Sequence, residues 1–314
     1  MTEAPAPSEI IDPTRVRYIK LGEGGDWEKE CLEKRIIRIG FGSAQTERFE
    51  LCQAGRWMEV FLSFVAEGKG KGTATRSMNE LRLFFEDVGS ILWITFIGGR
   101  LWWGLVDGTR ATTPHSDRDG VSRPIRDGWR STDLHGEQLT KDRLSGALTK
   151  LAAYQGTSCN VDVSAYVIRR INGQKTLEIE RALAASKEMQ ASVLGLMRLL
   201  GWPDFEILVD LVFTTSGWRR IGTVGKTQKT VDFDMVLPST GERAFVQVKS
   251  QTTTAELAKY VSEFHEGLYA KMFYVFHSGE AETTEQGVIV IGPEQLAERV
   301  MEAGLVGWLI QKVS

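Results

Sequence analysis

The strongest constraint on the fold lies in residues 230–251, TVDFDMVLPSTGERAFVQVKSQ, where polar and apolar side chains alternate on both sides of a turn. Alternation with a period of two is the pattern of a β-strand that buries one face. The turn at Pro238–Gly241 contains proline and glycine, so the two stretches are predicted to pair as antiparallel neighbours. The sequence therefore requires a sheet with one apolar face and one polar face.

The polar face carries carboxylates, an amide and an ammonium. Alternation puts Asp232 and Asp234 on one face of the first strand, and Gln247 and Lys249 on one face of the second. Oxygen ligands of this kind suit a hard divalent cation such as Mg²⁺, which keeps several of its waters. Lys249 can then orient or deprotonate an attacking water, or stabilise charge on a phosphorane, while the metal acts as a Lewis acid.

Residues 203–215, PDFEILVDLVFTT, predict a helix just before these strands. Apolar residues recur there at helical spacing, at Phe205, Leu208, Val209 and Val212. Pro203 suits the first turn, and Gly217 ends the helix. Glu206 and Asp210 lie four residues apart on a different face, so a carboxylate can point away from the core.

Residues 217–230, GWRRIGTVGKTQKT, form the most one-sided basic stretch of the chain and contain no acidic residue. Its basic side chains are Arg219, Arg220, Lys226 and Lys229. Positive charges beside glycines can follow a phosphodiester backbone, which makes these residues candidate nucleic-acid contacts. A solvated turn that happens to be basic is the alternative.

The order of these segments resembles the PD-(D/E)XK nuclease superfamily, and in particular its Mrr-like restriction endonuclease branch. The matching segments are FEILVDLVFTTSGW at 205–218, VDFD at 231–234 and VQVKS at 246–250. A predicted helix, TTAELAKYVSEFHEGL, and two predicted strands, KMFYVFHS and VIVIG, follow. The resemblance covers about residues 203–310 and implies an α/β domain with a central mixed sheet flanked by helices.

The resemblance also implies roles for individual residues. It places the helix glutamate of the family on Glu206, and its Gln-x-Lys pair on Gln247 and Lys249. The metal-binding aspartate falls on Asp234, because an apolar continuation follows it, with Asp232 as the rival. The resemblance thus makes all five residues candidates for catalysis, and all except Lys249 candidate ligands of Mg²⁺ or Mn²⁺.

One departure from the family pattern concerns the metal. Many superfamily members have a second carboxylate where Gln247 stands, so one negative charge fewer faces the cation here. Asp232 or Glu206 can compensate for this loss. Because some superfamily members have lost catalysis, an inactive nuclease fold is the alternative.

Residues 15–130 predict a separate, β-rich domain. Ile91–Val106 predicts a hairpin that turns at Gly98-Gly99, residues 57–65 predict an earlier strand, and Ser77–Asp87 predict a helix. This arrangement resembles a PUA/EVE-type fold. The resemblance implies a barrel that, in related proteins, binds modified nucleobases in an aromatic pocket.

Tryptophans of the hairpin are the candidate base contacts. Trp102 and Trp103 point to opposite faces, so only one can be buried in a single-layer core. The other can stack on a base extruded from a duplex, a contact worth about 1–3 kcal/mol. The candidate nucleic-acid contacts of this domain are Trp93, Trp102, Trp103, Arg76, Asn79 and Arg100. A structural or partner-binding role is the alternative.

The remaining segments complete an α+β organisation. Residues 1–14 are rich in proline, alanine and glutamate and predict a disordered tail. Residues 131–200 predict a helical connector, which leaves 201–314 for the domain with the nuclease resemblance. The formal net charge is −3, so a nucleic-acid surface must be a local patch.

Cysteine usage and hydropathy indicate the compartment. Cys31, Cys52 and Cys159 lack paired spacing, which argues against a disulfide framework or a cysteine zinc site and favours a reducing environment. No apolar run approaches the roughly 18 residues that span a bilayer, and the first residues lack the apolar segment of a signal peptide. We therefore expect a cytoplasmic protein with no membrane partner.

Together these features predict a Mg²⁺-dependent DNA endonuclease that restricts foreign DNA carrying modified bases, with double-stranded DNA as its partner. Breaking both strands needs two active sites, so a homodimer is expected. The alternative is a non-catalytic nucleic-acid-binding or protein-interaction component of a defence system, with the aromatic hairpin as a docking surface.

Overall fold

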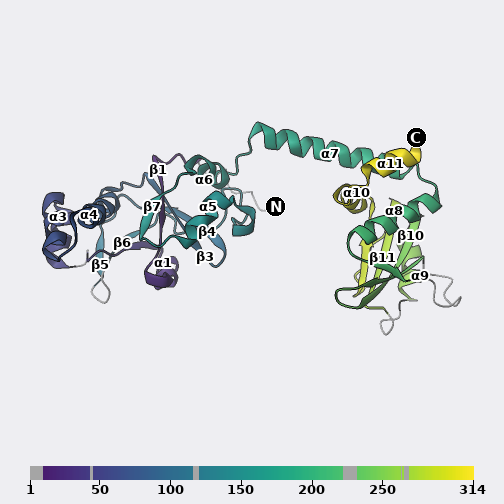
Figure 1. The fold of residues 1–314 in the computed structure, drawn as a ribbon, viewed down its shortest axis with the longest axis horizontal. Coiled ribbons are helices and arrows are strands. Elements are labelled where there is room, and N and C mark those ends of the chain that lie inside the picture. The colour runs from purple at the N-terminus through teal and green to yellow at the C-terminus, as the bar shows by residue number, and fades with distance from the viewer. Residues whose placement is uncertain (1–9, 43–44, 116–119, 222–231, 263, 265–268) are drawn as a thin grey trace, which may run out of the picture. The chain divides into compact units, whose positions relative to one another are not determined.

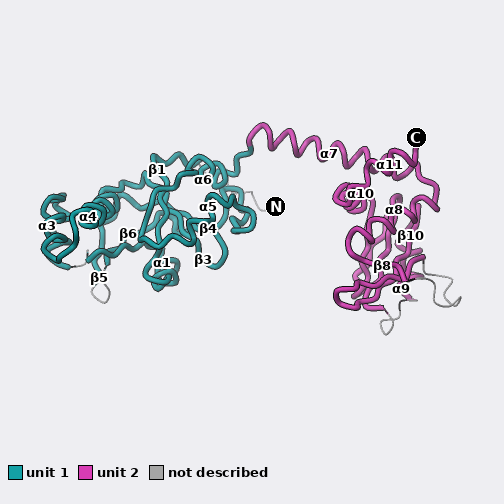
Figure 2. Tube along the Cα trace, viewed as in Figure 1, with its two compact units in different colours: residues 1–175 teal, residues 176–314 magenta. Residues whose placement is uncertain are grey.

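The computed structural model describes all residues except 1–9, 43–44, 116–119, 222–231, 263 and 265–268. It divides into an N-terminal unit, Met1–Lys175, and a C-terminal unit, Thr176–Ser314 (Figure 2). Both units contain helices and sheets, which confirms the α+β class. The predicted connector, 131–200, is divided between the units and does not form one of its own. Residues 10–14 of the predicted tail are described and lead into the first strand.

The larger sheet of the N-terminal unit has four strands in the order β4-β3-β1-β7 (Figure 1). Its strands are β1 (Arg15–Ile19), β3 (Ile91–Ile97), β4 (Arg100–Leu105) and β7 (Ser158–Asn160). β1 and β3 are parallel, while β3 and β4 form the predicted hairpin. The turn of the hairpin needs glycine, because Gly98 and Gly99 have φ values of 58° and 75°.

A second sheet of this unit has the order β2-β6-β5. Its strands are β2 (Ile36–Ile39), β5 (Thr113–His115) and β6 (Gly120–Pro124). Both sheets are open, so the described strands do not form the barrel that the PUA/EVE resemblance implied.

The N-terminal unit is also richer in helix than predicted. Its helices are α1 (Glu28–Glu33), α2 (Thr46–Gln53), α3 (Trp57–Ala66), α4 (Lys71–Glu86), α5 (Gly146–Thr149) and α6 (Ser164–Ile171), with short 3₁₀ turns η1 (Glu23–Gly25), η2 (Lys141–Arg143) and η3 (Lys150–Ala153). The strand predicted at 57–65 is wrong, because this segment is α3 and buries Val60 and Phe64 at helical spacing. The predicted helix at Ser77–Asp87 is the second half of α4.

The four-stranded sheet is covered on both faces. One core contains Ile19 and Trp93 of the sheet with Phe64 and Phe84 of α3 and α4. The other contains Trp103 with side chains of α5 and α6. The expectation of a single-layer core is therefore wrong, and neighbouring tryptophans on opposite faces both find apolar contacts.

The C-terminal unit is built on a mixed sheet of order β12-β11-β10-β9-β8. Its strands are β8 (Arg219–Ile221), β9 (Phe233–Leu237), β10 (Glu242–Thr252), β11 (Lys271–Gly279) and β12 (Val288–Ile291). β9 and β10 are antiparallel across the turn at Pro238–Gly241, as predicted, whereas β10, β11 and β12 run parallel.

Helices cover both faces of this sheet. They are α7 (Leu177–Met197), α8 (Trp202–Thr215), α9 (Thr254–Val261), α10 (Pro293–Glu302) and α11 (Val306–Val313). Val246 and Val248 of β10 share a core with α7, α8, α10 and α11, whereas Phe245 points to the opposite face and packs with Leu257 of α9. The predicted apolar stripe of α8 is buried in the first core. Among the described helices, none has the length and apolar character needed to cross a membrane.

Asp87, at the end of α4, is expected to stabilise the N-terminal unit strongly. Its buried carboxylate accepts hydrogen bonds from the backbone N–H groups of Gly89, Ser90 and Ile91 at 2.9, 3.0 and 3.2 Å, and from the Trp93 indole at 2.9 Å. Asp87→Ala would leave these donors unsatisfied, so we expect a loss of about 3 kcal/mol or more in denaturant-induced unfolding. Asp26→Ala, at an exposed position, is the control and should change stability by less than about 0.5 kcal/mol. Equal effects of the two substitutions would contradict this assignment.

Candidate active site in the C-terminal unit

Asp232 lies directly before β9 and is held against β10 by two hydrogen bonds. Its Oδ2 atom accepts one from the Gln247 side-chain Nε2 at 2.6 Å and one from the Val248 backbone N–H at 2.7 Å. Burial raises the pKa of this carboxyl, although Val248, Lys249 and Gln247 act in the opposite direction. The carboxylate is thus partly desolvated and fixed in orientation.

Gln247 is buried, with 4% of its surface exposed, yet it is only half satisfied. Its amide nitrogen donates to Asp232, while its buried Oε1 atom has no hydrogen-bond partner. Because a carboxylate only accepts hydrogen bonds, the contact itself fixes which end of the amide is the nitrogen. A buried oxygen without a partner costs about 1–3 kcal/mol and calls for a ligand, an ion or a water.

Lys249 is held by α9. Its Nζ atom lies 3.5 Å from the Glu256 carboxylate and 5.0 Å from the centre of the Tyr260 ring. Burial alone would lower the pKa of this ammonium, but Tyr260 and the carboxylates of Glu256 and Asp232 raise it by more. Lys249 is therefore charged at neutral pH. A charged ammonium suits two of the roles left open by the sequence, orienting a water and stabilising negative charge.

Glu206 reaches the same region from α8. Burial raises the pKa of its carboxyl, the charge of Asp232 raises it further, and Arg220 lowers it. The carboxylates of Glu206 on α8 and of Asp232 before β9 therefore interact electrostatically, and both are partly desolvated by burial. Asp232 therefore contacts Gln247 and interacts electrostatically with Glu206 and Lys249.

Asp234, the preferred metal ligand in the sequence analysis, has a different polar partner. It lies opposite Phe245 in the β9–β10 register and forms an ion pair with Arg243 at 2.7 Å. Asp232, the rival in the sequence analysis, is the aspartate that contacts Gln247. The apolar residues after Asp234, on which the preference for Asp234 was based, follow from its position within β9. Which carboxylate contacts Gln247 depends instead on the register between β9 and β10.

The basic residues before β9 are described only in part. Arg219 and Arg220 are exposed on β8, and the Arg220 guanidinium lies 4.5 Å from the centre of the Phe233 ring. Arg220 also lowers the pKa of Glu206, so it borders the carboxylates. The predicted contacts Lys226 and Lys229 lie outside the described residues.

The donor set fits a sparsely ligated divalent cation. Among the residues that the structure describes, no group of three or more His, Cys, Asp or Glu side chains is arranged to hold a metal. Mg²⁺, however, binds through one or two carboxylates and keeps its other waters. The Asp232 carboxylate beside the unsatisfied Gln247 Oε1 atom supplies two oxygens of the required kind, with Glu206 as a further carboxylate.

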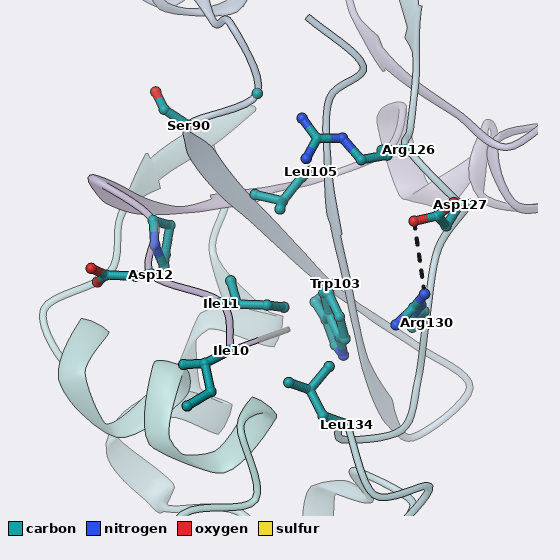
Figure 3. Close-up of a pocket in the computed structure, with 13 residues that line it drawn as sticks. Ile10, Ile11, Asp12, Ser90, Trp103, Leu105, Arg126, Asp127, Arg130 and Leu134 are labelled. Carbon is teal, nitrogen blue, oxygen red and sulfur yellow. Dashed lines mark ion pairs between the residues drawn. The ribbon is translucent and has the colours of Figure 1, made fainter. Parts of the chain in front are cut away.

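The aromatic residues proposed as base contacts in the N-terminal unit are mostly core residues. Trp93 is fully buried and donates to Asp87. Trp103 is 4% exposed, donates to the Thr132 carbonyl at 2.7 Å and lines a cavity of about 550 Å³ (Figure 3). Trp102 is partly buried and donates to the Ile97 carbonyl at 3.2 Å. Neither Trp93 nor Trp103 therefore offers a free ring face for stacking.

The polar candidates of that unit are accessible. Arg76 and Asn79 are exposed on α4, and Arg100 is exposed at the start of β4. Conversely, sequence reasoning missed Glu256 and Tyr260, which contact Lys249 from α9. Their spacing of four residues, on the helix that follows the Gln-x-Lys strand, is the signal that could have identified them.

Comparison with known proteins adds no relative to this description. No protein-family model matches the chain, and no significant match was found among curated proteins or among solved structures.

Proposed function

We propose that the C-terminal unit is a metal-dependent DNA endonuclease that hydrolyses phosphodiester bonds. The observation that carries the proposal is the Asp232 carboxylate, oriented by Gln247 and Val248, beside an unsatisfied buried amide oxygen and a charged lysine. Such a group of oxygen ligands and one cation suits phosphoryl chemistry, in which negative charge develops on the reacting phosphate.

Each residue has a role in this proposal. Asp232 and the Gln247 Oε1 atom would hold Mg²⁺ or Mn²⁺, with Glu206 available as a further carboxylate. The cation would act as a Lewis acid on the phosphate. Lys249 stabilises charge on the phosphate, and Glu256 and Tyr260 position its ammonium. Burial and the charge of Asp232 raise the pKa of Glu206, which makes this carboxylate a stronger base and a candidate to accept a proton from water.

The biological setting follows from the resemblance to Mrr-like enzymes. The helix, two antiparallel strands, helix and parallel strand that this resemblance implies occur in the chain as α8, β9, β10, α9 and β11. On this basis we propose restriction of foreign double-stranded DNA, with modified bases as the feature that is read. Cutting both strands requires two active sites, which favours a homodimer.

A second candidate is a nucleic-acid-binding component with an inactive nuclease fold. The observation in its favour is the amide at position 247, which leaves fewer carboxylates at the site than a metal usually meets. Cleavage assays decide between the two. Purified protein is incubated with Mg²⁺ or Mn²⁺ and two phage DNAs, with and without modified cytosines, beside Lys249→Ala. DNA that is bound but never cut would favour the inactive component.

Substitution of the two aspartates should separate their roles. Asp232→Asn removes the charge that faces Gln247, so we expect cleavage to fall about 100-fold or more. Asp234→Asn breaks only the ion pair with Arg243, so cleavage should fall by less than about 10-fold, a loss traceable to the partly exposed pair. Rates on one DNA substrate, measured with equal amounts of folded protein, test this order. The reverse order would restore Asp234 as the ligand.

Metal binding should depend on pH in a direction set by the raised carboxyl pKa values. Protons compete with a cation for Asp232 and Glu206, and they do so at higher pH than at ordinary carboxyls because both pKa values are raised. Millimolar Mg²⁺ should therefore stabilise the protein at pH 8 and raise its melting temperature. The gain in the free energy of unfolding is about 1–2 kcal/mol if the cation is at ten times its Kd. This gain should be lost as the pH falls through the raised pKa values.

The same thermal experiment has its own control. Asp232→Asn should abolish the stabilisation by Mg²⁺, and Asp234→Asn should retain it. Stabilisation of equal size at acidic and alkaline pH, or in both variants, would show that the cation binds elsewhere.

A further inference from the structure

A hollow of about 560 Å³ in the N-terminal unit is lined by basic side chains from three separate segments. Lys34 and Arg35 follow α1, Arg110 follows β4, and Arg126 follows β6. Two carboxylates also line the hollow, so basic side chains outnumber acidic ones by four to two. The chain has a net negative charge, and this concentration of positive charge is therefore local.

The two carboxylates are engaged with other groups. Asp107 accepts hydrogen bonds from the Thr109 N–H at 3.1 Å and from the Thr109 hydroxyl at 2.6 Å. These bonds lower the pKa of Asp107, with smaller contributions from Arg110 and Arg126. Asp127 lies 3.8 Å from Arg130, the ion pair dashed in Figure 3.

The arginines of the hollow lack ion-pair partners. Lys34 is paired with Glu30, but Arg35, Arg110 and Arg126 form no ion pair with any residue in the described part of the chain. Two buried arginines of this unit do have carboxylate partners: Arg17 pairs with Glu80, and Arg48 with Glu67. Arg35, Arg110 and Arg126 thus line one hollow without an ion-pair partner among the described residues, and Arg126 also lines the cavity in Figure 3.

Two backbone segments beside the hollow, at Arg35 and at residues 125–128, include left-handed residues and are connected to each other. Arg35 and Asp127 have φ values of 55° and 60°, a left-handed conformation that is unfavourable for a residue other than glycine. Gly128 follows, and a Cβ atom there would lie 3.2 Å from Cγ and Cδ of Arg35, so glycine lets the arginine stem pack across the turn. The Ile125 N–H donates to the Arg35 carbonyl at 2.8 Å and connects the two segments. Strain of this kind is characteristic of ligand sites.

We propose that Arg35, Arg110 and Arg126 form a phosphate-binding site. Guanidinium groups bind phosphate oxygens in a bidentate fork, and a rigid backbone reduces the entropy lost on binding. The phosphate is that of a DNA backbone, a choice of source that rests on the proposed function; a small phosphate compound shares the same chemistry. The site lies in the N-terminal unit and contains none of the residues assigned to cleavage.

Full-length protein carrying Arg110→Gln and Arg126→Gln together tests the site, because both positions are exposed and have ordinary backbone angles. The matched control carries Lys141→Gln and Arg143→Gln, which remove two exposed charges of the same unit. Binding of a fluorescent duplex is measured in EDTA, between about 50 and 200 mM salt, so no cleavage interferes. We expect the test variant to bind about 10-fold more weakly, with a salt slope smaller by about 1–2, since each phosphate contact contributes about 0.9.

Thermal unfolding supplies the second arm. Inorganic phosphate and thymidine 5′-monophosphate, compared with chloride at equal ionic strength, should raise the melting temperature of the wild type and the control but not of the test variant. Weaker duplex binding by the test variant supports the site and identifies DNA as the source. Unchanged duplex binding with lost stabilisation by phosphate supports the site with a small phosphate compound as the source. A test variant that matches the control in both arms overturns the proposal. A failure of the nuclease proposal would leave these binding results unaffected.

Discussion

The contact between Asp232 and β10 determines the chemistry available to the C-terminal unit. A carboxylate here accepts from the Gln247 amide and from the Val248 N–H, so its position depends on how β9 and β10 are aligned. A shift of one residue between these strands would exchange the polar and apolar faces of β9. The cores on both faces of the sheet prevent that shift, because Val246 and Val248 fit one core and Phe245 the other.

In the N-terminal unit, the charged groups that matter for the structure are arginine side chains. This unit buries guanidinium groups and pairs them with carboxylates, as at Arg17 and Arg48, which secures helices and strands to one another. Arg35, Arg110 and Arg126 line a shared hollow and form no ion pair with a described residue. In the proposal made above these three arginines bind phosphate, whereas Arg17 and Arg48 stabilise the fold.

Sequence reasoning succeeded where a periodic pattern continues across an element. The apolar stripe of α8 and the alternation across Pro238–Gly241 were confirmed. It failed at 57–65, because aromatic and β-branched residues favour strands locally while packing of Val60 and Phe64 selects a helix. It preferred Asp234 to Asp232 as the metal ligand, whereas the structure places Asp232 against Gln247; register is a property of two strands together and is not visible in one. The tryptophans were misjudged because a second covered sheet face leaves no trace in the alternation of one hairpin.

Glutamine at position 247 has a consequence for the order of events at the proposed active site. With glutamate there, two buried carboxylates would repel each other, and one would retain a proton at neutral pH. The amide instead bridges to Asp232, so this carboxylate is oriented before any ligand arrives. In the proposed function, a divalent cation would meet one negative charge fewer at this site, which would weaken its binding. A site of this kind would exchange its metal rapidly, and the supply of free divalent ions, more than the folding of the protein, would govern when it is active.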